Sequence, residues 1–176
     1  GIEAVEAAGR DRADEGDIRV QDLLGQTELA GVSPDRSIAR RYFEDLFNAG
    51  ELGLAEEILD PDITFVGPIT PGGLHGLDAF KRFAESWYSG FPDRHFDVVE
   101  EWDDGDRIAT LFHITGTHRG AFLGQAATGN AIDVWVMNFF RIQGGKIQAI
   151  QAFFNPLDLL QPIGLAPTRD ALSLTL

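Results

Sequence analysis

Four histidines are the side chains of this chain best suited to move a proton near neutral pH. An imidazole has an ordinary pKa of about 6.5, so it can act as a general acid or a general base. The four are His75, His95, His113 and His118, and no two of them are four residues apart, as the ligands of a His-x-x-x-His metal site are. The spacing therefore predicts no metal site and leaves proton transfer as the chemistry to consider.

Each histidine is also open to a structural interpretation. His113 lies between apolar neighbours in a strand-like segment, where it is either a packed, hydrogen-bonded side chain or a base. His118 lies in the run Gly116-Thr117-His118-Arg119-Gly120, where it either anchors the following loop or takes part in chemistry. His75 belongs to a glycine-rich loop, and His95 is expected to face solvent at the start of a strand. His113 and His118 are therefore the catalytic candidates among the four.

Several classes of function are excluded or disfavoured by composition. The sequence has no cysteine, which excludes thiolate nucleophiles, disulfides and cysteine-ligated zinc or iron–sulfur centres. The pairs Gly72-Gly73 and Gly144-Gly145 are typical of turns, so no phosphate-binding or dinucleotide-binding loop is predicted, and we expect no cofactor. With 14 basic and 28 acidic side chains the net charge is -14, which disfavours nucleic acid and anionic membrane surfaces as partners.

The length of 176 residues, with 44% hydrophobic content, predicts one domain with a sizeable core. Residues 1–32 mix charges with scattered apolar positions, so we expect an N-terminal extension that is a solvated tail or, over Val20–Leu29, a short docking helix. The domain is expected over residues 33–166, followed by a C-terminal tail over residues 167–176. No apolar run approaches the roughly 18 to 20 residues of a membrane-spanning helix, and we expect a cytoplasmic protein.

The chain before position 91 shows the periodicity of helices. Ser33 and Pro34 predict a helix start, because serine caps free backbone amides and proline suits the first helical position. This helix ends at Gly50, and a second, short helix is predicted over Leu52–Leu59. A third helix closes near Gly90, and its apolar positions recur at helical spacing: Phe80, Phe83, Ala84, Trp87 and Tyr88.

Other segments have the period of strands, bounded by turns. The predicted strands are Asp62–Val66, His95–Trp102, Arg107–His118, Ala131–Ile142 and Ile147–Asn155. Tight turns between the later strands make them antiparallel neighbours. Helices followed by an antiparallel meander indicate an α+β fold, in which a curved sheet wraps the three helices and encloses a ligand between sheet and helices.

Short motifs recur along the chain in a characteristic order. They are His75-Gly76, Phe91-Pro92-Asp93, Gly116 to Gly120, Phe122-Leu123-Gly124, Thr128-Gly129, Arg141-Ile142, Gly145-Lys146-Ile147 and Leu159 to Gly164. In this order and spacing, residues 34–165 resemble the SnoaL-like polyketide cyclases. The resemblance implies a cone-shaped α+β barrel like nuclear transport factor 2, in which a curved antiparallel sheet wraps three helices around a deep pocket. It also implies a homodimer formed through the outer face of the sheet.

The resemblance places the family's polar site residues at three positions of this chain. The last-strand aspartate, the general acid and base of ring closure in these cyclases, corresponds to Ala152, and the histidine of the preceding strand corresponds to Asn138. An asparagine on the first strand corresponds to Phe65. Alanine cannot move a proton and asparagine can only hydrogen-bond a carbonyl, so the family's acid–base pair is missing. Asp133 becomes a catalytic candidate if this count is off by one residue.

Strand alternation extends the candidate pocket from these positions. If Ala152 and Asn138 face the cavity, Gln148, Ile150, Val134, Val136 and Phe140 share that face. The helix aromatics belong either to the core or to the pocket wall. The predicted substrate-binding side chains are Tyr42, Phe65, Trp87, Tyr88, Val136, Phe140, Gln148, Ile150 and Ala152.

Two orientations follow from the same alternation. The opposite face of segment 131–142 carries Asp133, Trp135, Met137, Phe139 and Arg141, much of it apolar. We expect a homodimer interface there, with an exposed site as the alternative. The orientation of segment 107–118 stays open, because one register turns His113 inward with Leu111, Thr115 and Thr117, and the other turns His118 inward with Phe112 and Ile114.

We interpret the chain as a biosynthetic cyclase or isomerase that closes a ring in an apolar, polyketide-like small molecule. Preorganisation of a flexible substrate can supply about 7 to 11 kcal/mol, enough for a cycloaddition or related ring closure without proton transfer. Asn138 would then polarise a carbonyl, whereas an aldol cyclase would recruit His113, His118 or Asp133. The alternatives are a non-catalytic binding or assembly module of the same fold and an epoxide-hydrolase-like enzyme.

Overall fold

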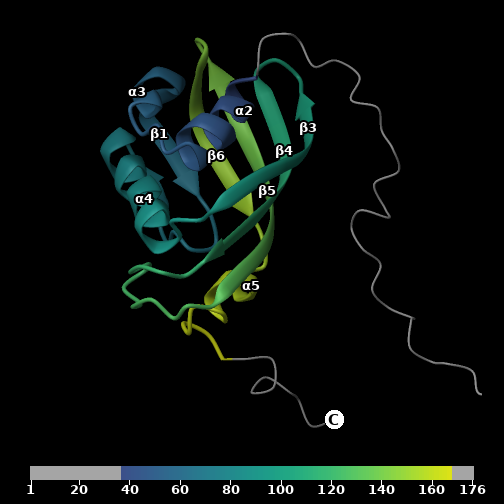
Figure 1. The fold of residues 1–176 in the computed structure, drawn as a ribbon. Helices are drawn as coiled ribbons and strands as arrows, with labels where there is room; N and C mark the ends of the chain where they lie inside the picture. Colours follow the sequence, from purple (N-terminus) through teal and green to yellow (C-terminus); the bar gives the residue numbers. More distant parts are fainter. Residues whose placement is uncertain (1–36, 168–176) are drawn as a thin grey trace, which may run out of the picture. The chain divides into compact units, whose positions relative to one another are not determined.

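The computed structural model describes residues 37–167. Their strands form one six-stranded sheet in the order β2-β1-β6-β5-β4-β3 (Figure 1). The N-terminal extension expected over residues 1–32 and the tail from residue 168 onward lie outside the described residues. In chain order the elements are α2 Ile38–Arg41, η1 Tyr42–Asn48, α3 Leu54–Ile58, β1 Leu59–Val66, β2 Leu74–His75, α4 Leu77–Gly90, β3 His95–Asp103, β4 Arg107–Thr117, β5 Ala131–Gln143, β6 Lys146–Phe153 and α5 Pro156–Leu160.

The sheet is strongly curved, and the helices α2, η1, α3 and α4 lie on its concave side (Figure 1). The predicted α+β fold, with a curved sheet around helices, is therefore confirmed. One pair departs from the expected antiparallel sheet: β1 runs parallel to β6, while the other neighbouring pairs are antiparallel, so the sheet is mixed. Between β1 and β6 the chain passes through β2, α4 and the strands β3, β4 and β5, which is the kind of long crossover that parallel neighbours require.

The first helical segment begins at a serine cap and changes its winding. The Ser37 hydroxyl accepts a hydrogen bond from the Arg40 backbone N–H at 3.1 Å, which caps the first turn of α2. The chain then continues as the π-helix η1, whose wider turn buries Tyr42 and Phe43 together with Leu46 and Phe47. The helix start expected at Ser33 and Pro34 lies outside the described residues.

The second helix and the first strand differ from their predicted bounds. The helix α3 is shorter than the predicted Leu52–Leu59, and β1 begins at Leu59 instead of Asp62. Pairing between β1 and β6 starts at Leu59 and resumes only at Thr64. Pro61 lies in this gap, where the backbone N–H that it lacks is not needed in the ladder.

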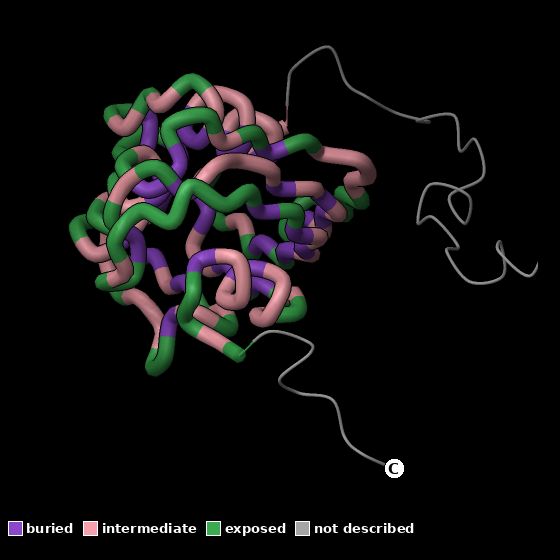
Figure 2. Tube along the Cα trace, turned by 60° about the horizontal axis from the view of Figure 1, so that its bottom comes forward, coloured by how far each residue is buried: buried purple, intermediate pink, exposed green. Residues whose placement is uncertain are grey.

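The core is aromatic and lies between the helices and the inner face of the sheet. Phe43 of η1 packs 4.4 Å from Phe112 of β4, and Phe47 packs 4.8 Å from Phe96 of β3, between ring centroids. Buried positions alternate with half-buried or exposed ones along β4 and β5, and such alternation is visible in Figure 2. On β4 this alternation settles the orientation that the sequence leaves open, because Phe112, Ile114 and His118 are buried.

A bulge changes the inner face of β6. The ladder between β5 and β6 shifts between Arg141 and Ile142, and Gln148 is the extra residue opposite this step. Regular alternation would have placed Gln148 inward with Ala152, whereas it is only half-buried. The buried positions of β6 are Ile147, Ile150 and Ala152.

Within residues 37–167, no helix is long and apolar enough to cross a membrane.

Candidate functional site

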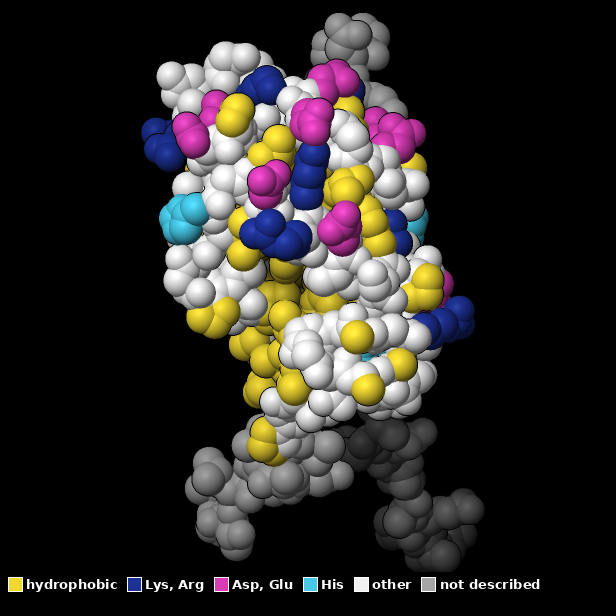
Figure 3. Space-filling view, turned by 90° about the vertical axis from the view of Figure 1, so that its left-hand side faces the viewer, with side chains coloured by type: hydrophobic (Ala, Val, Ile, Leu, Met, Phe, Trp, Pro, Cys, Tyr) yellow, Lys and Arg dark blue, Asp and Glu magenta, His cyan; other side chains and the backbone are white. Residues whose placement is uncertain are grey.

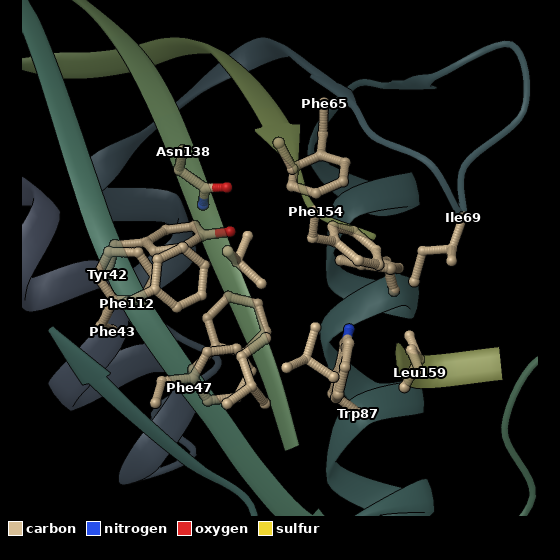
Figure 4. Close-up of a pocket in the computed structure, with 16 residues that line it drawn as sticks. Tyr42, Phe43, Phe47, Phe65, Ile69, Trp87, Phe112, Asn138, Phe154 and Leu159 are labelled. Carbon is tan, nitrogen blue, oxygen red and sulfur yellow. The ribbon is translucent and has the colours of Figure 1, made fainter. Parts of the chain in front are cut away.

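A pocket opens between the inner face of the sheet and the helices (Figure 4). Its empty volume is about 470 Å³, the open space at its mouth included. Most of the lining side chains are aromatic or aliphatic. They are Tyr42, Phe43, Phe47, Phe65, Ile69, Phe83, Trp87, Phe96, Phe112, Ile114, Val134, Val136, Asn138, Ala152, Phe154 and Leu159.

The mouth and the bottom of the pocket differ in exposure. Ile69, Phe83 and Phe154 are half-buried, so they mark the mouth. Figure 3 shows hydrophobic side chains gathered in a hollow of the molecular surface, below a band of charged side chains. Tyr42 and Asn138 are buried and mark the bottom. A ligand would therefore pass an apolar mouth before it meets a polar group at the far end.

Three neutral side chains supply the polar atoms of the lining: Tyr42, Trp87 and Asn138. The Trp87 indole nitrogen points into the pocket in Figure 4. Asn138 is 3% exposed, and within residues 37–167 its Oδ1 atom has no hydrogen-bond partner. Because buried polar atoms in folded proteins are normally paired, this amide is the chemically distinctive group of the pocket.

Tyr42 stays protonated under ordinary conditions. Burial raises its pKa well above the usual value, and the nearby Tyr88 adds to this effect. Its ring packs 5.0 Å from Phe43 and 5.3 Å from Phe140, which fixes its position. The hydroxyl can therefore donate a hydrogen bond in the pocket and is unsuited to act as a base.

The positions where the family's polar groups were expected lie in the pocket wall. Asn138 of β5 is the Cα partner of Ala152 of β6, and both line the pocket together with Phe65. A Cβ atom added at Gly67 would stand 3.2 Å from that of Ala152, so this part of the wall is tightly packed. The pocket thus has a methyl group and an amide where the sequence resemblance implies an acid and a base.

Four of the predicted substrate-binding side chains do not line the pocket. Phe140 and Ile150 are buried in the core beside it, and the β6 bulge takes Gln148 out of the lining. The Tyr88 hydroxyl donates to the Leu46 carbonyl at 2.5 Å, and the Arg94 guanidinium lies 4.1 Å from the Tyr88 ring centroid. These contacts give Tyr88 a structural role, since its polar end is already paired.

Two catalytic candidates lie on the other side of the sheet. The His113 Nε2 atom is 2.7 Å from the Asp133 Oδ1 atom, and the His113 ring stacks on Trp135 at 4.7 Å between centroids. The Asp133 side chain is exposed, and neither residue lines the pocket. Strand alternation therefore turns both residues to the outer face, away from this pocket, and for His113 it decides the orientation that the sequence leaves open.

His118 is buried and holds a loop. The Thr128 backbone N–H donates to its Nδ1 atom at 3.2 Å, and the Gly129 backbone N–H donates to its carbonyl at 2.9 Å. Since Nδ1 accepts, the neutral ring carries its proton on Nε2. Burial lowers the pKa of His118, while a hydrogen bond with the Gly120 backbone opposes this effect. His118 does not line the pocket, so its contacts fit the loop-anchoring interpretation.

Sequence reasoning missed several lining residues. Phe43 and Phe47 lie on the same helical face as Tyr42, so their helical spacing in the sequence could have indicated that they line the pocket. The sequence gives no such indication for Ile69, in the loop between β1 and β2, or for Leu159, in α5. Only the tertiary fold brings these segments to the mouth.

The lining holds no charged side chain, and within the described residues no group of three or more His, Cys, Asp or Glu side chains is arranged to hold a metal ion. The arrangement can hold an apolar molecule, donate hydrogen bonds from Tyr42, Trp87 and Asn138, and accept one at Asn138. It offers no side chain with the properties of a general base at neutral pH.

Comparison with known families gives a match over residues 37–163 to the model of the SnoaL-like polyketide cyclases. The chain belongs to this family. Its sequence resemblance is thereby confirmed, and family membership supports a cyclase- or isomerase-type role. No curated protein matches the chain.

Solved structures with similar folds carry related names. A candidate SnoaL-like polyketide cyclase from Jannaschia sp. CCS1 has a TM-score of 0.65 and 22% identity, covering 77% of this chain and 100% of that one. IdmH from Streptomyces antibioticus, a candidate polyketide cyclase, has a TM-score of 0.60 and 23% identity, with 72% and 96% covered. AclR from Streptomyces galilaeus, a candidate hydroxylase, has a TM-score of 0.61 and 23% identity, with 75% and 89% covered. At this level of identity the likeness establishes the fold.

Proposed function

We propose that this protein closes a ring in an apolar, polyketide-like intermediate by folding the substrate and hydrogen-bonding it, without the aspartate acid–base chemistry expected from its family. One observation carries the proposal. The pocket wall is apolar, and its buried end holds a neutral amide, Asn138, beside Ala152 at the position of the acid.

Substrate folding would supply most of the rate enhancement. A flexible chain enclosed by aromatic walls loses conformers in which its reacting ends are far apart, and such preorganisation is worth about 7 to 11 kcal/mol in favourable cases. The rings that line the pocket are themselves held by contacts such as Phe43 on Phe112 at 4.4 Å. A fixed wall of this kind suits cycloaddition and related ring closures, in which no proton moves.

Hydrogen bonding would supply the remainder. The Asn138 amide N–H and the Tyr42 hydroxyl are donors in a site with low polarity, where a hydrogen bond to a developing negative charge on a carbonyl oxygen is strengthened. The raised pKa of Tyr42 keeps its proton in place, so it acts as a donor throughout the reaction. The two groups therefore polarise a substrate carbonyl at the bottom of the pocket.

A non-catalytic binding module is the second candidate function. It is favoured by the lining itself, in which the only titratable side chain is Tyr42, held as a neutral phenol. Such a module would bind the same apolar molecules without converting them. Epoxide hydrolysis is less well supported, since it requires a group that activates water, and the lining contains no carboxylate or histidine.

We also propose that the protein forms a homodimer through the outer face of the sheet. Trp102, Phe139 and Phe153 are 48%, 44% and 50% exposed on that face, an unusual amount of aromatic surface for a monomer. A second copy would cover these rings by isologous contact.

The proposed function is tested by turnover. The full chain is incubated with a panel of linear polyketide, polyene and epoxide substrates, and products are identified by mass spectrometry and chromatography against a buffer control. A cyclic isomer of unchanged mass, formed faster than in buffer, is the expected result. Binding without conversion across the panel would favour the binding module, and a mass gain of one water would favour epoxide hydrolysis.

A further inference from the structure

Two buried polar side chains, each with one oxygen that has no hydrogen-bond partner among the described residues, lie opposite each other on neighbouring strands. Thr110 of β4 and Asn138 of β5 are Cα partners, and both side chains belong to the inner face. Thr110 is fully buried and Asn138 is 3% exposed. Among the described residues, neither Thr110 Oγ1 nor Asn138 Oδ1 has a hydrogen-bond partner. Two such atoms on paired residues are unusual, because a buried polar atom left unpaired costs free energy.

The Asn138 amide is also aimed at the ligand space. Asn138 lines the pocket, and Figure 4 shows its amide pointing into the space between Tyr42 and Phe65. Its Oδ1 atom can only accept a hydrogen bond, so the missing partner must bring a donor. Among the other polar lining side chains, Trp87 only donates, and the Tyr42 hydroxyl can both donate and accept.

The partner that brings this donor must also be neutral. No lining side chain is charged, and the whole chain has a net charge of -14. Moving a carboxylate or ammonium group into an apolar pocket without a counter-charge is far more costly than moving a hydroxyl group. An anionic ligand is opposed by the charge of the protein in addition.

We infer that the bottom of the pocket is a subsite for a neutral hydroxyl or enol group, which donates its hydrogen bond to Asn138 Oδ1 while the apolar body of the molecule lies against the aromatic walls. The inference rests on the proposed function, since it assigns the substrate class of the same pocket. Asn138 is then a specificity-determining residue: substrates with a free hydroxyl or enol at the buried end are bound, and their ethers and carboxylates are rejected. A site that hydrogen-bonds a hydroxyl discriminates strongly against analogues that lack it.

The test uses three probes with one apolar body. Isothermal titration calorimetry measures the binding of 2-naphthol, 2-methoxynaphthalene and 2-naphthoate to the full chain. We expect 2-naphthol to bind at least about tenfold more tightly than 2-methoxynaphthalene, and 2-naphthoate to bind most weakly. Equal affinity of the two neutral probes, tightest binding of the carboxylate, or no binding of any probe would overturn the subsite.

Two matched substitutions test whether Asn138 causes the preference for 2-naphthol over 2-methoxynaphthalene. Asn138→Leu keeps the approximate size of the side chain and removes its acceptor, so the two neutral probes should bind within about threefold of each other. Gln151→Leu makes the same chemical change at an exposed position of β6 and should keep the tenfold preference. Thermal unfolding checks that both variants fold, and Asn138→Ala replaces Asn138→Leu if the larger side chain is not accepted. A preference that survives removal of the amide would overturn the assignment to Asn138.

Failure of this inference can be told apart from failure of the proposed function. The probe measurement needs no turnover, and the substrate panel needs no probe. Selective binding of 2-naphthol without ring closure on any panel substrate would remove the cyclase proposal and keep the subsite. Ring closure together with equal affinity for the two neutral probes would remove the subsite and keep the cyclase proposal.

Discussion

The polar side chains on the two faces of the strands β4 and β5 differ in exposure and in hydrogen bonding. On the outer face His113 and Asp133 form a hydrogen-bonded pair at 2.7 Å, stacked on Trp135 and reached by solvent. On the inner face Thr110 and Asn138 are buried, and within residues 37–167 neither Thr110 Oγ1 nor Asn138 Oδ1 has a hydrogen-bond partner. The outer pair is the better acid–base combination by residue type, yet neither of its residues lines the pocket between sheet and helices.

This difference shows that residue type is a poor guide to function without the face on which the residue lies. Successive side chains of a strand point to opposite faces, so a shift of one residue exchanges a pocket group for a surface group. The outer pair is satisfied by its own hydrogen bond, whereas Asn138 inside has an acceptor that a ligand can fill. An unpaired buried group is thus a stronger indication of ligand binding than a paired exposed one.

The largest expected effect separates two adjacent phenylalanines on these faces. Phe140 is 2% exposed and Phe139 is 44% exposed. Phe140→Ala should lower the free energy of unfolding by about 3 to 5 kcal/mol through a core cavity. Phe139→Ala should lower it by less than about 1 kcal/mol in the monomer. Urea unfolding measures both values, and equal losses would contradict the assignment of the two faces.

A second experiment on the same pair of variants addresses the outer surface. If a second copy covers the exposed rings, Phe139→Ala should weaken dimerisation and Phe140→Ala should not do so beyond its effect on folding. Sedimentation velocity over a range of protein concentrations measures the dimer fraction. A wild-type chain that stays monomeric at every concentration would contradict the proposed homodimer.

The next effect concerns catalysis at the two polar sites. Asn138→Ala should raise the activation barrier of ring closure by about 2.7 kcal/mol, a hundredfold loss in kcat, if the amide stabilises charge on a carbonyl. His113→Ala, on the outer face, should leave kcat within about twofold of wild type. Single-turnover kinetics on the substrate found in the panel measures both. A larger loss for His113→Ala than for Asn138→Ala would reverse the roles of the two faces.

A smaller expected effect is the pH dependence of stability that the buried histidine causes. Burial lowers the pKa of His118 below its ordinary value of 6.5, so the unfolded chain binds the proton more readily than the folded chain does. Stability should therefore fall as the pH drops below 6.5 and through the lowered folded pKa. His118→Gln should flatten this dependence in thermal unfolding curves. The pKa values of Asp93 and Glu56 are lowered in the folded chain, so the stability that these carboxylates contribute is lost only at lower pH, below their ordinary values of 3.8 and 4.5.

The smallest expected effect is that of Ala152→Asp, which should not raise kcat. Ala152→Asp restores an acid at the family position, but the proposed ring closure moves no proton, so kcat should not rise. The new carboxyl would lie in an apolar wall, which raises its pKa and costs stability. Turnover rates and unfolding temperatures compared with those of Ala152→Asn separate the effect of the acid from that of its size. A rise in kcat for Ala152→Asp alone would show that acid–base chemistry operates in this pocket.

Much of the fold was accessible from local sequence patterns. The period of the α4 segment, with Trp87 and Tyr88 on one face, predicts the helix that the structure contains. The turn glycines Gly144 and Gly145 predict the hairpin between β5 and β6, and both adopt positive φ. The inward face of β5 follows from alternation alone. The same alternation failed on β6, where a bulge moves Gln148 out of register.

The sequence by itself determined the longer helices and strands, the fold family and the loss of the acid, because these depend on the residues of one segment and on their spacing. Only the tertiary structure decided which histidine is buried, how β1 pairs with β6, and which loops close the pocket. Ile69 and Leu159 come from distant segments that meet at one opening. Such meetings depend on long-range strand register and packing, which local periodicity does not encode.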